Sequence, residues 1–169
     1  MTNVLFVCHG NICRSTMAEY VMRHLVRERG LEDAIACDSA ATSTEELGNP
    51  VHPGTRRVLE RHGIACGNHH ARQMGRADYD AYDLLIGMDQ NNVDNMVRLL
   101  LRRTGWSRWH LDVSDVAAAD PQGKVRKLLD WAPRPRDIAD PWYTHDFDTT
   151  FADVLEGCET LLDALVAES

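Results

Sequence analysis

The sequence of 169 residues lacks an apolar run of the roughly 20 residues that a membrane span requires. Its first apolar run, Val4–Val7, has only four residues and no basic segment before it, so we expect neither a signal peptide nor an anchor. Five cysteines form an odd set without the spacing of a disulfide framework. Reduced thiols are typical of a cytoplasm, and we expect a cytoplasmic protein that binds no membrane.

Basic residues are also few, with 18 Lys and Arg against 26 Asp and Glu and a net charge of −8. A dedicated nucleic-acid binder needs a basic surface, so we expect no nucleic-acid partner. The acidity is concentrated in residues 137–169, which hold nine acids and no Lys or Arg. The first 136 residues have 18 basic and 17 acidic side chains, a net charge of +1. Eight histidines are scattered without the spacing of metal ligands, so we expect no metal site.

The length and the pattern of the chain are typical of one α/β domain, which we expect to span residues 1–169. Short apolar runs that suggest buried strands alternate with segments of helical periodicity, an arrangement typical of an open, mostly parallel sheet. Ser15 is expected to cap the first helix, and Trp106–Gly123 is expected to be a loop, forming an insertion. The expected strands are Val4–Val7, Ala34–Ala36 with the residues up to Ala41, Leu84–Met88, and part of Val125–Trp131. The expected helices are Ser15–Gly30, Thr55–His62, Asp89 to about Arg103, and a long terminal helix from Phe147.

The segment Cys8–Ser15, which reads CHGNICRS, lies between the first strand and the first helix. Open α/β sheets bind ligands at the carboxyl ends of their strands. The backbone N–H groups of such a loop and of the helix N-terminus can converge on one anion. Arg14 can add a bidentate contact to a phosphate, and Cys8 would face the same donors as a nucleophilic thiolate. The segment therefore predicts nucleophilic chemistry on a tetrahedral anion.

Cysteine, five residues, then Arg-Ser is the signature of protein tyrosine phosphatases, and VCHGNICRS resembles their low-molecular-weight class. The resemblance implies a three-layer α/β sandwich, with a four-stranded parallel sheet in the order 2-1-3-4 and helices on both faces. It implies that Cys8 attacks phosphorus to form a cysteinyl-phosphate, that Arg14 clamps the phosphate oxygens, and that Ser15 donates a hydrogen bond to the thiolate. The implied phosphate-binding residues are His9, Gly10, Asn11, Ile12, Cys13 and Arg14.

Two features of this loop also follow from the resemblance. In the family, the asparagine at Asn11 holds the loop in shape through a serine and a histidine, for which Ser39 and His69 are the matching positions. Cys13 is found in many members, where it can form a disulfide with the nucleophile that protects Cys8 from irreversible oxidation. A buried small hydrophobic residue is an equally good interpretation of Cys13.

Hydrolysis of an aryl phosphate needs a proton for the leaving group and then a base for the attacking water. Asp140-Pro141-Trp142-Tyr143 resembles the late Asp-Pro-aromatic-aromatic loop of the family, which makes Asp140 the general acid and base. Asp-Pro alone is ordinary turn chemistry, and its place just before the terminal helix favours the catalytic role. Met88-Asp89 also resembles the family, with Asp89 expected to cap the next helix or to position the surroundings of Arg14.

The substrate cleft implied by the resemblance has Trp142 and Tyr143 as one wall. The opposite wall of the family often carries an aromatic residue, at the position that Glu45 occupies here. A carboxylate there would repel an incoming dianion, so we expect weaker or differently selective binding of aryl phosphates. Leu47 and Trp142 are then expected to supply the apolar contact.

We therefore expect a phosphatase without metal or cofactor that acts on phosphotyrosine in proteins and has a tyrosine kinase as a functional partner. One alternative is a thioredoxin-coupled arsenate reductase, which shares the fold and the loop but needs a relay of further cysteines. Cys66 is the candidate for that relay, and no cysteine follows it closely. The other alternative is a phosphotyrosine-binding module with negligible turnover.

Overall fold

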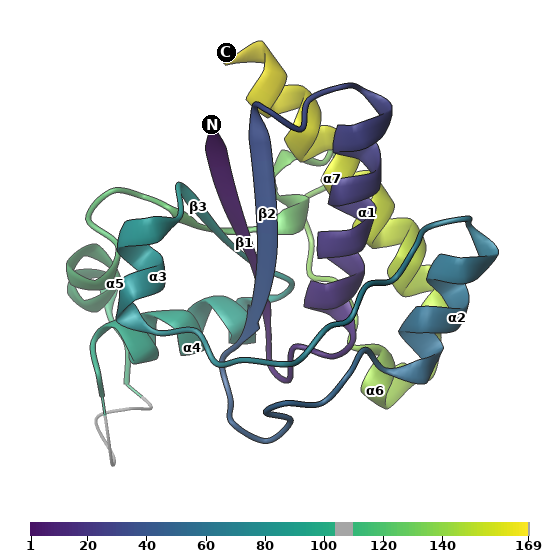
Figure 1. The fold of residues 1–169 in the computed structure, drawn as a ribbon. Coiled ribbons are helices and arrows are strands. Elements are labelled where there is room, and N and C mark those ends of the chain that lie inside the picture. The colour runs from purple at the N-terminus through teal and green to yellow at the C-terminus, as the bar shows by residue number, and fades with distance from the viewer. Residues whose placement is uncertain (104–109, 169) are drawn as a thin grey trace.

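The computed structural model describes residues 1–103 and 110–168. Its centre is a four-stranded, wholly parallel sheet in the order β2-β1-β3-β4, so the predicted strand order is confirmed (Figure 1). The strands are β1 Thr2–Cys8, β2 Ile35–Ala41, β3 Leu84–Gly87 and β4 Val125–Lys127.

Helices cover both faces of this sheet, as predicted (Figure 1). On one side lie α1 Arg14–Glu28, α2 Pro53–Arg61, the 3₁₀ turn η2 Leu128–Trp131, α6 Pro141–Thr144 and α7 Phe147–Ala167. On the other side lie α3 Arg76–Ala81, α4 Gln90–Leu100 and α5 Val113–Ala119. No helix among the described residues is long and apolar enough to cross a membrane.

The central strand β1 divides the core because successive side chains point to opposite faces of the sheet. Val4 and Phe6 belong to the core beneath α1 and α7, whereas Leu5 and Val7 belong to the core beneath α4. All four side chains are fully buried. A strand buried on both faces must be continuously apolar, which explains why the Val4–Val7 run was recognisable in the sequence.

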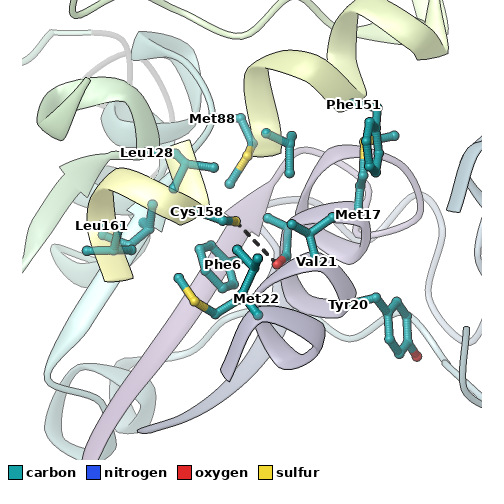
Figure 2. Packing of buried hydrophobic residues seen from close by; sticks show 14 of the residues in the cluster. Phe6, Met17, Tyr20, Val21, Met22, Met88, Leu128, Phe151, Cys158 and Leu161 are labelled. Atoms are coloured by element: carbon teal, nitrogen blue, oxygen red, sulfur yellow. Dashed lines mark hydrogen bonds between the residues drawn. The ribbon is translucent and has the colours of Figure 1, made fainter. Parts of the chain in front are cut away.

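The terminal helix α7 packs directly on the rest of this core (Figure 2). The Cys158 thiol lies 3.6 Å from the carbonyl oxygen of Ala18 in α1. Gly157 allows a close approach on the neighbouring side, since a Cβ atom there would lie 2.5 Å from Cγ of Leu128. The glycine therefore lets η2 pack against α7, and η2 leads into the segment that carries Asp140.

Two local predictions were wrong, and helix α3 was missed. Helix α1 begins at Arg14 after Cys13 as N-cap, because the Ser15 hydroxyl bonds within the preceding loop instead of capping the helix. The predicted loop Trp106–Gly123 contains α5, whose N-cap Asp112 accepts a hydrogen bond from the backbone of Asp115. Residues 106–109 of that segment lie outside the described residues. Helix α3, a single short turn without long periodicity, was not predicted at all.

The parallel register brings the carboxyl ends of the strands to one edge of the sheet. Cys8 at the end of β1 is paired with Ala41 at the end of β2, and Val7 is paired with Gly87 at the end of β3. The loops that follow β1, β2 and β3 therefore meet at this edge, at the lower end of the sheet in Figure 1.

Candidate active site

A cleft of about 640 Å³ opens at this edge of the sheet. It brings together residues more than 120 positions apart in the sequence, from the Cys8 loop, the segment after β2, the start of α4 and the segment around Asp140. The predicted residues that line it are Cys8, His9, Gly10, Ile12, Cys13, Arg14, Glu45, Asp140, Trp142 and Tyr143. Four other predicted residues, Asn11, Ser15, Ser39 and His69, are buried behind the loop.

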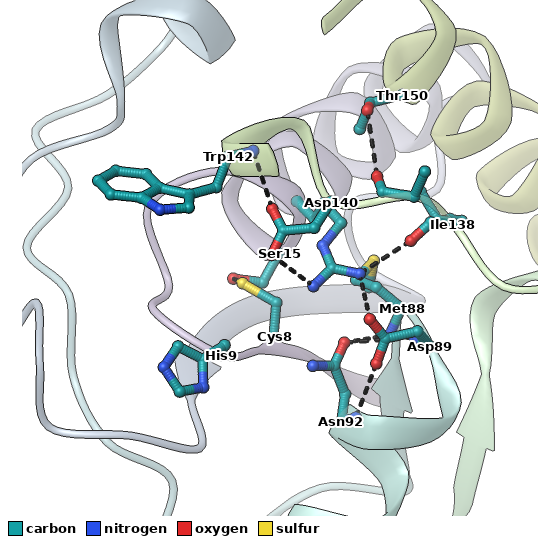
Figure 3. Close-up of polar contacts among 12 residues, drawn as sticks. Cys8, His9, Ser15, Met88, Asp89, Asn92, Ile138, Asp140, Trp142 and Thr150 are labelled. Carbon is teal, nitrogen blue, oxygen red and sulfur yellow. Dashed lines mark hydrogen bonds and ion pairs between the residues drawn. The ribbon is translucent and has the colours of Figure 1, made fainter. Parts of the chain in front are cut away.

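Cys8 lies at the floor of the cleft, where β1 ends (Figure 3). Its Sγ atom is 3.1 Å from Oγ of Ser15 and 3.4 Å from the backbone nitrogen of Asn11, which donates to it. The Ser15 oxygen already accepts a hydrogen bond from Nδ2 of Asn11 at 2.9 Å, so its own hydrogen is available for the sulfur. The sulfur therefore faces two hydrogen-bond donors, the Ser15 hydroxyl and the Asn11 backbone nitrogen.

Asn11 holds the loop from behind, in a left-handed conformation with φ of 60°. Such a conformation is costly for a residue other than glycine and persists only where surrounding contacts fix it. The side-chain amide of Asn11 donates to Ser15 and, at 2.9 Å, to Oγ of Ser39, while its oxygen accepts from the backbone nitrogen of Arg72 at 3.1 Å. The predicted contact between Asn11 and Ser39 is therefore present.

The predicted histidine contact is made with the main chain instead of the side chain of Asn11. His69 Nε2 lies 2.7 Å from the backbone oxygen of Asn11. Burial lowers the pKa of His69 and favours the neutral ring, which donates to this carbonyl through its Nε2–H tautomer. The side-chain amide of Asn11 is thus left to donate to the two serines, and its oxygen to accept from Arg72.

Sequence reasoning missed the buried carboxylate behind Ser39, which belongs to Glu19. Glu19 accepts a hydrogen bond of 2.5 Å from Oγ of Ser39 and pairs with Arg23 at 2.6 Å. Burial raises the pKa of Glu19, and the bonds from Ser39 and the charge of Arg23 oppose that rise. From its position in the first turns of the predicted helix, we expected only that the negative charge of Glu19 favours the helix N-terminus. A buried acid two turns into an amphipathic helix could have been suspected because it falls on the apolar face.

Arg14 is almost completely buried, with 2% of its surface exposed, beside the sulfur of Cys8. Its Nη1 atom donates to Oδ2 of Asp89 at 2.6 Å and to the backbone oxygen of Ile138 at 2.8 Å. Its Nη2 atom lies 3.1 Å from Oδ2 of Asp140. Burial alone would lower the pKa of Arg14, but the negative groups Cys8, Asp89 and Asp140 raise it above the ordinary value. The guanidinium is thus held charged and aimed into the cleft.

Asp89 has both of the functions considered for it. Its Oδ1 atom accepts from the backbone nitrogen of Asn92 and caps α4, while its Oδ2 atom holds Arg14. Ile138, whose carbonyl also accepts from Arg14, is itself held by its backbone nitrogen. That nitrogen donates to the backbone oxygen of Met88 at 2.9 Å. The segment before Asp140 is therefore fixed to the end of β3, a backbone pairing that a side-chain pattern could not reveal.

Asp140 is the N-cap of α6, and its two carboxylate oxygens have different partners (Figure 3). Oδ1 accepts from the backbone nitrogen of Trp142 at 3.1 Å, whereas Oδ2 faces Arg14. Pro141 occupies the first helical position, where its missing N–H costs nothing and its fixed φ favours the turn. The carboxyl group is thereby held beside Arg14, in the cleft that has Cys8 at its floor.

The rim of the cleft is exposed and of mixed character. Trp142 and Tyr143 on one side are 53% and 80% exposed. On the other side Glu45 lines the cleft and its Oε2 atom lies 2.9 Å from Nε2 of His9. The prediction that Leu47 lines the cleft was wrong: its side chain is exposed on the surface, and the adjacent Glu46 lines the cleft instead. The conformation of this loop, which residue types alone do not determine, decides which side chain points inward.

Among the described residues, no group of three or more His, Cys, Asp and Glu side chains is placed to hold a metal ion. Cys13 lines the cleft as a free thiol, and burial, with the charges of Cys8 and Asp140, raises its pKa to about 12. Cys13 is therefore protonated at neutral pH. Beside Cys8, the groups placed to meet an anion are Arg14 and backbone N–H groups of the loop.

A cysteine sulfur, a buried arginine and a carboxyl group lie in one cleft, as the resemblance implied. Residues 3–169 match the family model described as low molecular weight phosphotyrosine protein phosphatase. The chain belongs to this family. The match covers the whole described fold apart from the first two residues, and it makes the protein a phosphatase.

Individual members of the family are similar along their full length. The low molecular weight protein-tyrosine-phosphatase YfkJ of Bacillus subtilis is 35% identical, over 99% of this chain and 98% of its own. Its crystal structure matches with a TM-score of 0.87 over 100% of this chain and 97% of that one. The structure of SP-PTP from Streptococcus pyogenes is 34% identical, with a TM-score of 0.77 over 98% and 93% of the two chains.

The fold also occurs in a protein named for another activity. The structure of DARP, a drosophila arginine phosphatase, is 29% identical to this chain, with a TM-score of 0.76 and 97% of each chain covered. The same fold is thus found in a protein named for a different phosphorylated residue.

Proposed function

We propose that this protein is a single-domain protein-tyrosine phosphatase that hydrolyses phosphotyrosine and small aryl phosphates through a cysteinyl-phosphate intermediate. The observation that carries the proposal is the convergence of Cys8, Arg14 and Asp140 in one cleft. Family membership supports the phosphatase class. The aromatic side chains of Trp142 and Tyr143 at the rim favour an aromatic leaving group.

In the first step, the Cys8 thiolate attacks phosphorus, an S–P bond forms, and the bond from phosphorus to the tyrosyl oxygen breaks. Arg14 and the backbone N–H groups of the loop stabilise the charge on the equatorial oxygens. Asp140 donates its proton to the departing oxygen. A dianionic phosphate between Arg14 and Asp140 would replace their direct contact and repel the carboxylate charge, which favours the protonated acid needed for this step.

In the second step, water attacks the cysteinyl-phosphate and the S–P bond breaks. Asp140, now ionised, accepts the proton of that water, so one carboxyl group serves as acid and then as base. The sulfur leaves as a thiolate that the Ser15 hydroxyl stabilises across 3.1 Å. Inorganic phosphate is then released, and neither step uses a metal or a cofactor.

The substrates of this activity would be phosphotyrosine-containing proteins of the cytoplasm, phosphorylated there by a tyrosine kinase. The cysteine relay of an arsenate reductase receives no support from the site, since Cys66 does not line the cleft. A binding module without turnover would not need Asp140 beside the guanidinium of Arg14. Phosphoarginine is retained as a comparison substrate because of the similarity to the arginine phosphatase.

The test is hydrolysis of p-nitrophenyl phosphate and of phosphotyrosine and phosphoarginine peptides by the wild-type protein and by Cys8→Ser. We expect the wild type to prefer phosphotyrosine, and Cys8→Ser to lose turnover while still binding phosphate. A Cys8→Ser, Asp140→Ala double variant should retain phosphotyrosine proteins from a cell extract. Phosphate binding with negligible turnover of every substrate by the wild type would instead favour the binding module, and thioredoxin-dependent arsenate reduction would favour the reductase.

A further inference from the structure

The catalytic cleft continues into a second hollow of about 320 Å³. His9, Asn95 and Arg98 line both spaces, so the cleft and the hollow form one trough. The hollow lies between α4 and the segment that follows β2, both at the lower end of the sheet in Figure 1. None of the three groups that we propose for catalysis lines it, so phosphoryl transfer itself leaves the hollow unused.

Two sides of the hollow come from opposite flanks of the central strand β1. His9 follows β1, which lies between β2 and β3 in the sheet. Gln73 belongs to the β2 flank, because it forms a bridge with Ala41 at the end of β2. Asn95 belongs to the other flank, because it lies in α4, which follows β3. Gln73 and Asn95 therefore lie on opposite sides of the hollow that both of them line.

The side chains of Gln73 and Asn95 are carboxamides, and one hydrogen bond fixes the orientation of each. Nη1 of Arg98 lies 3.0 Å from the amide of Asn95 and, because a guanidinium only donates, the atom that faces it is Oδ1. Nε2 of Gln73 lies 3.0 Å from the backbone oxygen of Thr42, which only accepts. The Nδ2 donor of Asn95 and the Oε1 acceptor of Gln73 form no hydrogen bond among the described residues and remain available to a ligand.

A donor on one side of a trough and an acceptor on the other are complementary to a peptide unit. The unit is planar and trans, so its C=O and N–H groups point in opposite directions. Its oxygen can accept from Asn95 while its nitrogen donates to Gln73, and neither contact requires a charge. An extended chain advances about 3.3 Å per residue, so a peptide unit near a phosphotyrosine in the cleft can reach the adjoining hollow.

We infer that Gln73 and Asn95 bind a main-chain peptide unit of the substrate, close to its phosphotyrosine. The inference rests on the proposed function and specifies the substrate class: phosphotyrosine within a polypeptide, in preference to free phosphotyrosine or a small aryl phosphate. The two carboxamides touch none of the reacting atoms and determine specificity only. Because they bind the main chain, their contribution does not depend on the side chains that flank the phosphotyrosine.

The test measures kcat and KM for a phosphotyrosine peptide and for matched peptides in which one amide at a time is replaced by an ester. The replacements cover the three residues on either side of the phosphotyrosine. An ester has no N–H and its carbonyl is a weaker acceptor. We expect a replacement at one position to raise KM about threefold to tenfold, the effect of losing one hydrogen bond, with kcat unchanged. A wild-type protein for which no ester raises KM would overturn the inference.

Gln73→Met and Asn95→Ala each remove one carboxamide. Both should raise KM for the unmodified peptide by a similar factor, while kcat and KM for p-nitrophenyl phosphate stay at the wild-type values and show that the variants are folded. Asn95→Asp keeps an acceptor for Arg98 but has no donor, so it should also raise KM for the peptide. Gln90→Ala is the matched control, since Gln90 is an exposed carboxamide of α4 that lines neither the cleft nor the hollow.

The combination of variant and ester is decisive. In Gln73→Met the acceptor for the peptide N–H is gone, so the sensitive ester should raise KM no further. An ester effect of equal size in Gln73→Met and in the wild type would contradict the pairing. A KM that follows the charge of the flanking side chains and ignores the esters would contradict it as well. The proposed function is tested separately, because it fails if the wild type does not hydrolyse p-nitrophenyl phosphate or if Cys8→Ser retains turnover.

Discussion

The two segments that form the catalytic cleft are held in opposite ways. The loop of Cys8–Ser15 is supported from behind by buried side chains, and both Asn11 and Ser15 are fully buried. The segment that begins at Asp140 is largely exposed beyond its first two residues, with Trp142 and Tyr143 open to solvent. The loop is fixed by a hydrogen-bonded network, whereas the acid segment is fixed mainly through backbone anchors at its start.

This difference separates the chemistry from the selection of substrates. The groups that we propose to bind the phosphate are preorganised by the fold, which is the condition for electrostatic stabilisation of a transition state. The residues that meet the rest of a substrate are exposed, and their replacement disturbs little else. Substitutions in the chemical groups should therefore change kcat strongly, substitutions in the support should change kcat and stability together, and substitutions at the rim should change mainly KM.

The largest effect among the predictions is expected at Asp140. Asp140→Asn removes the acid and base but keeps the N-cap and the shape of the side chain, so kcat should fall about 10²–10⁴-fold. Inorganic phosphate should still inhibit with a similar Ki, because Arg14 and the loop remain. Asp137→Asn is a matched control, since Asp137 lies in the same segment and forms an exposed pair with Lys127. Equal activity of Asp140→Asn and the wild type would exclude Asp140 as the acid.

A smaller effect is expected when the support of the loop is removed. Asn11→Ala eliminates three side-chain hydrogen bonds and leaves a left-handed residue without its compensating contacts. We expect kcat/KM to fall about 10–100-fold and the free energy of unfolding to fall by about 2 kcal/mol. Kinetics with p-nitrophenyl phosphate and urea unfolding measure the two.

Asn11→Gly separates the two causes of that loss. Glycine adopts a positive φ without strain but cannot form the side-chain bonds. It should recover part of the stability and little of the activity. Full recovery of kcat/KM by glycine would show that Asn11 acts through backbone conformation alone and that the contacts with Ser15 and Ser39 are dispensable.

His52 joins the two segments and is expected to have an intermediate effect. Its backbone nitrogen donates to the carbonyl of Ile12 in the loop, and its Nδ1 atom caps α2 by accepting from Gly54. Its ring stacks on Phe147 at 5.1 Å and meets the edge of Trp142 at 6.0 Å. His52→Ala should therefore lower kcat about fivefold and the free energy of unfolding by about 1 kcal/mol.

The same residue predicts a pH dependence. Burial, with the charge of Arg57, lowers the pKa of His52 below its ordinary value of 6.5, so the folded protein favours the neutral ring whose Nδ1 caps α2. The unfolded chain binds the proton more readily, so the contribution of His52 to stability is complete above about pH 6.5 and is lost as the pH falls through the lowered pKa. His52→Asn keeps a good cap that does not titrate. Its unfolding free energy should vary less between pH 7 and 5 than that of the wild type; an identical variation would contradict the assignment.

The sequence was sufficient for the parts of the fold that depend on local patterns. The run Val4–Val7 was recognisable because a strand buried on both faces is continuously apolar. The long helix from Phe147 was recognisable because burial of one helix face leaves a periodic apolar pattern. The helices α3 and α5 are too short for such a signal and depend on caps and tertiary contacts. The strand order 2-1-3-4 came from the resemblance and not from the pattern.

In the candidate site, too, the residues that belong to a local motif could be predicted and the others could not. The loop signature located Cys8 and Arg14 because their spacing occurs together with an apolar strand before it, a helix after it and the adjacent Ser15. Glu19 and the carbonyl of Ile138 were missed, since a carboxylate on an apolar helix face and a backbone oxygen have no motif of their own. The orientations of Leu47 and Glu46 depend on a loop conformation that residue types alone do not determine.

The smallest effect is expected at the rim, at Glu45. Its carboxylate lines the cleft and pairs with His9, so it places negative charge near an incoming dianion. Glu45→Tyr replaces that charge with an aromatic face opposite Trp142 and should lower KM for p-nitrophenyl phosphate about threefold, with kcat unchanged. Steady-state kinetics at low ionic strength measure both constants.

Glu45→Gln separates charge from aromatic contact, because it removes the carboxylate without adding a ring. If repulsion dominates, glutamine should produce most of the decrease in KM, and added salt should diminish the difference between glutamine and the wild type. If stacking dominates, only tyrosine should lower KM, at any salt concentration. No change in KM for either variant would show that Glu45 is too distant from the bound phosphate to affect it, and the rim would then select substrates through Trp142 and Tyr143 alone.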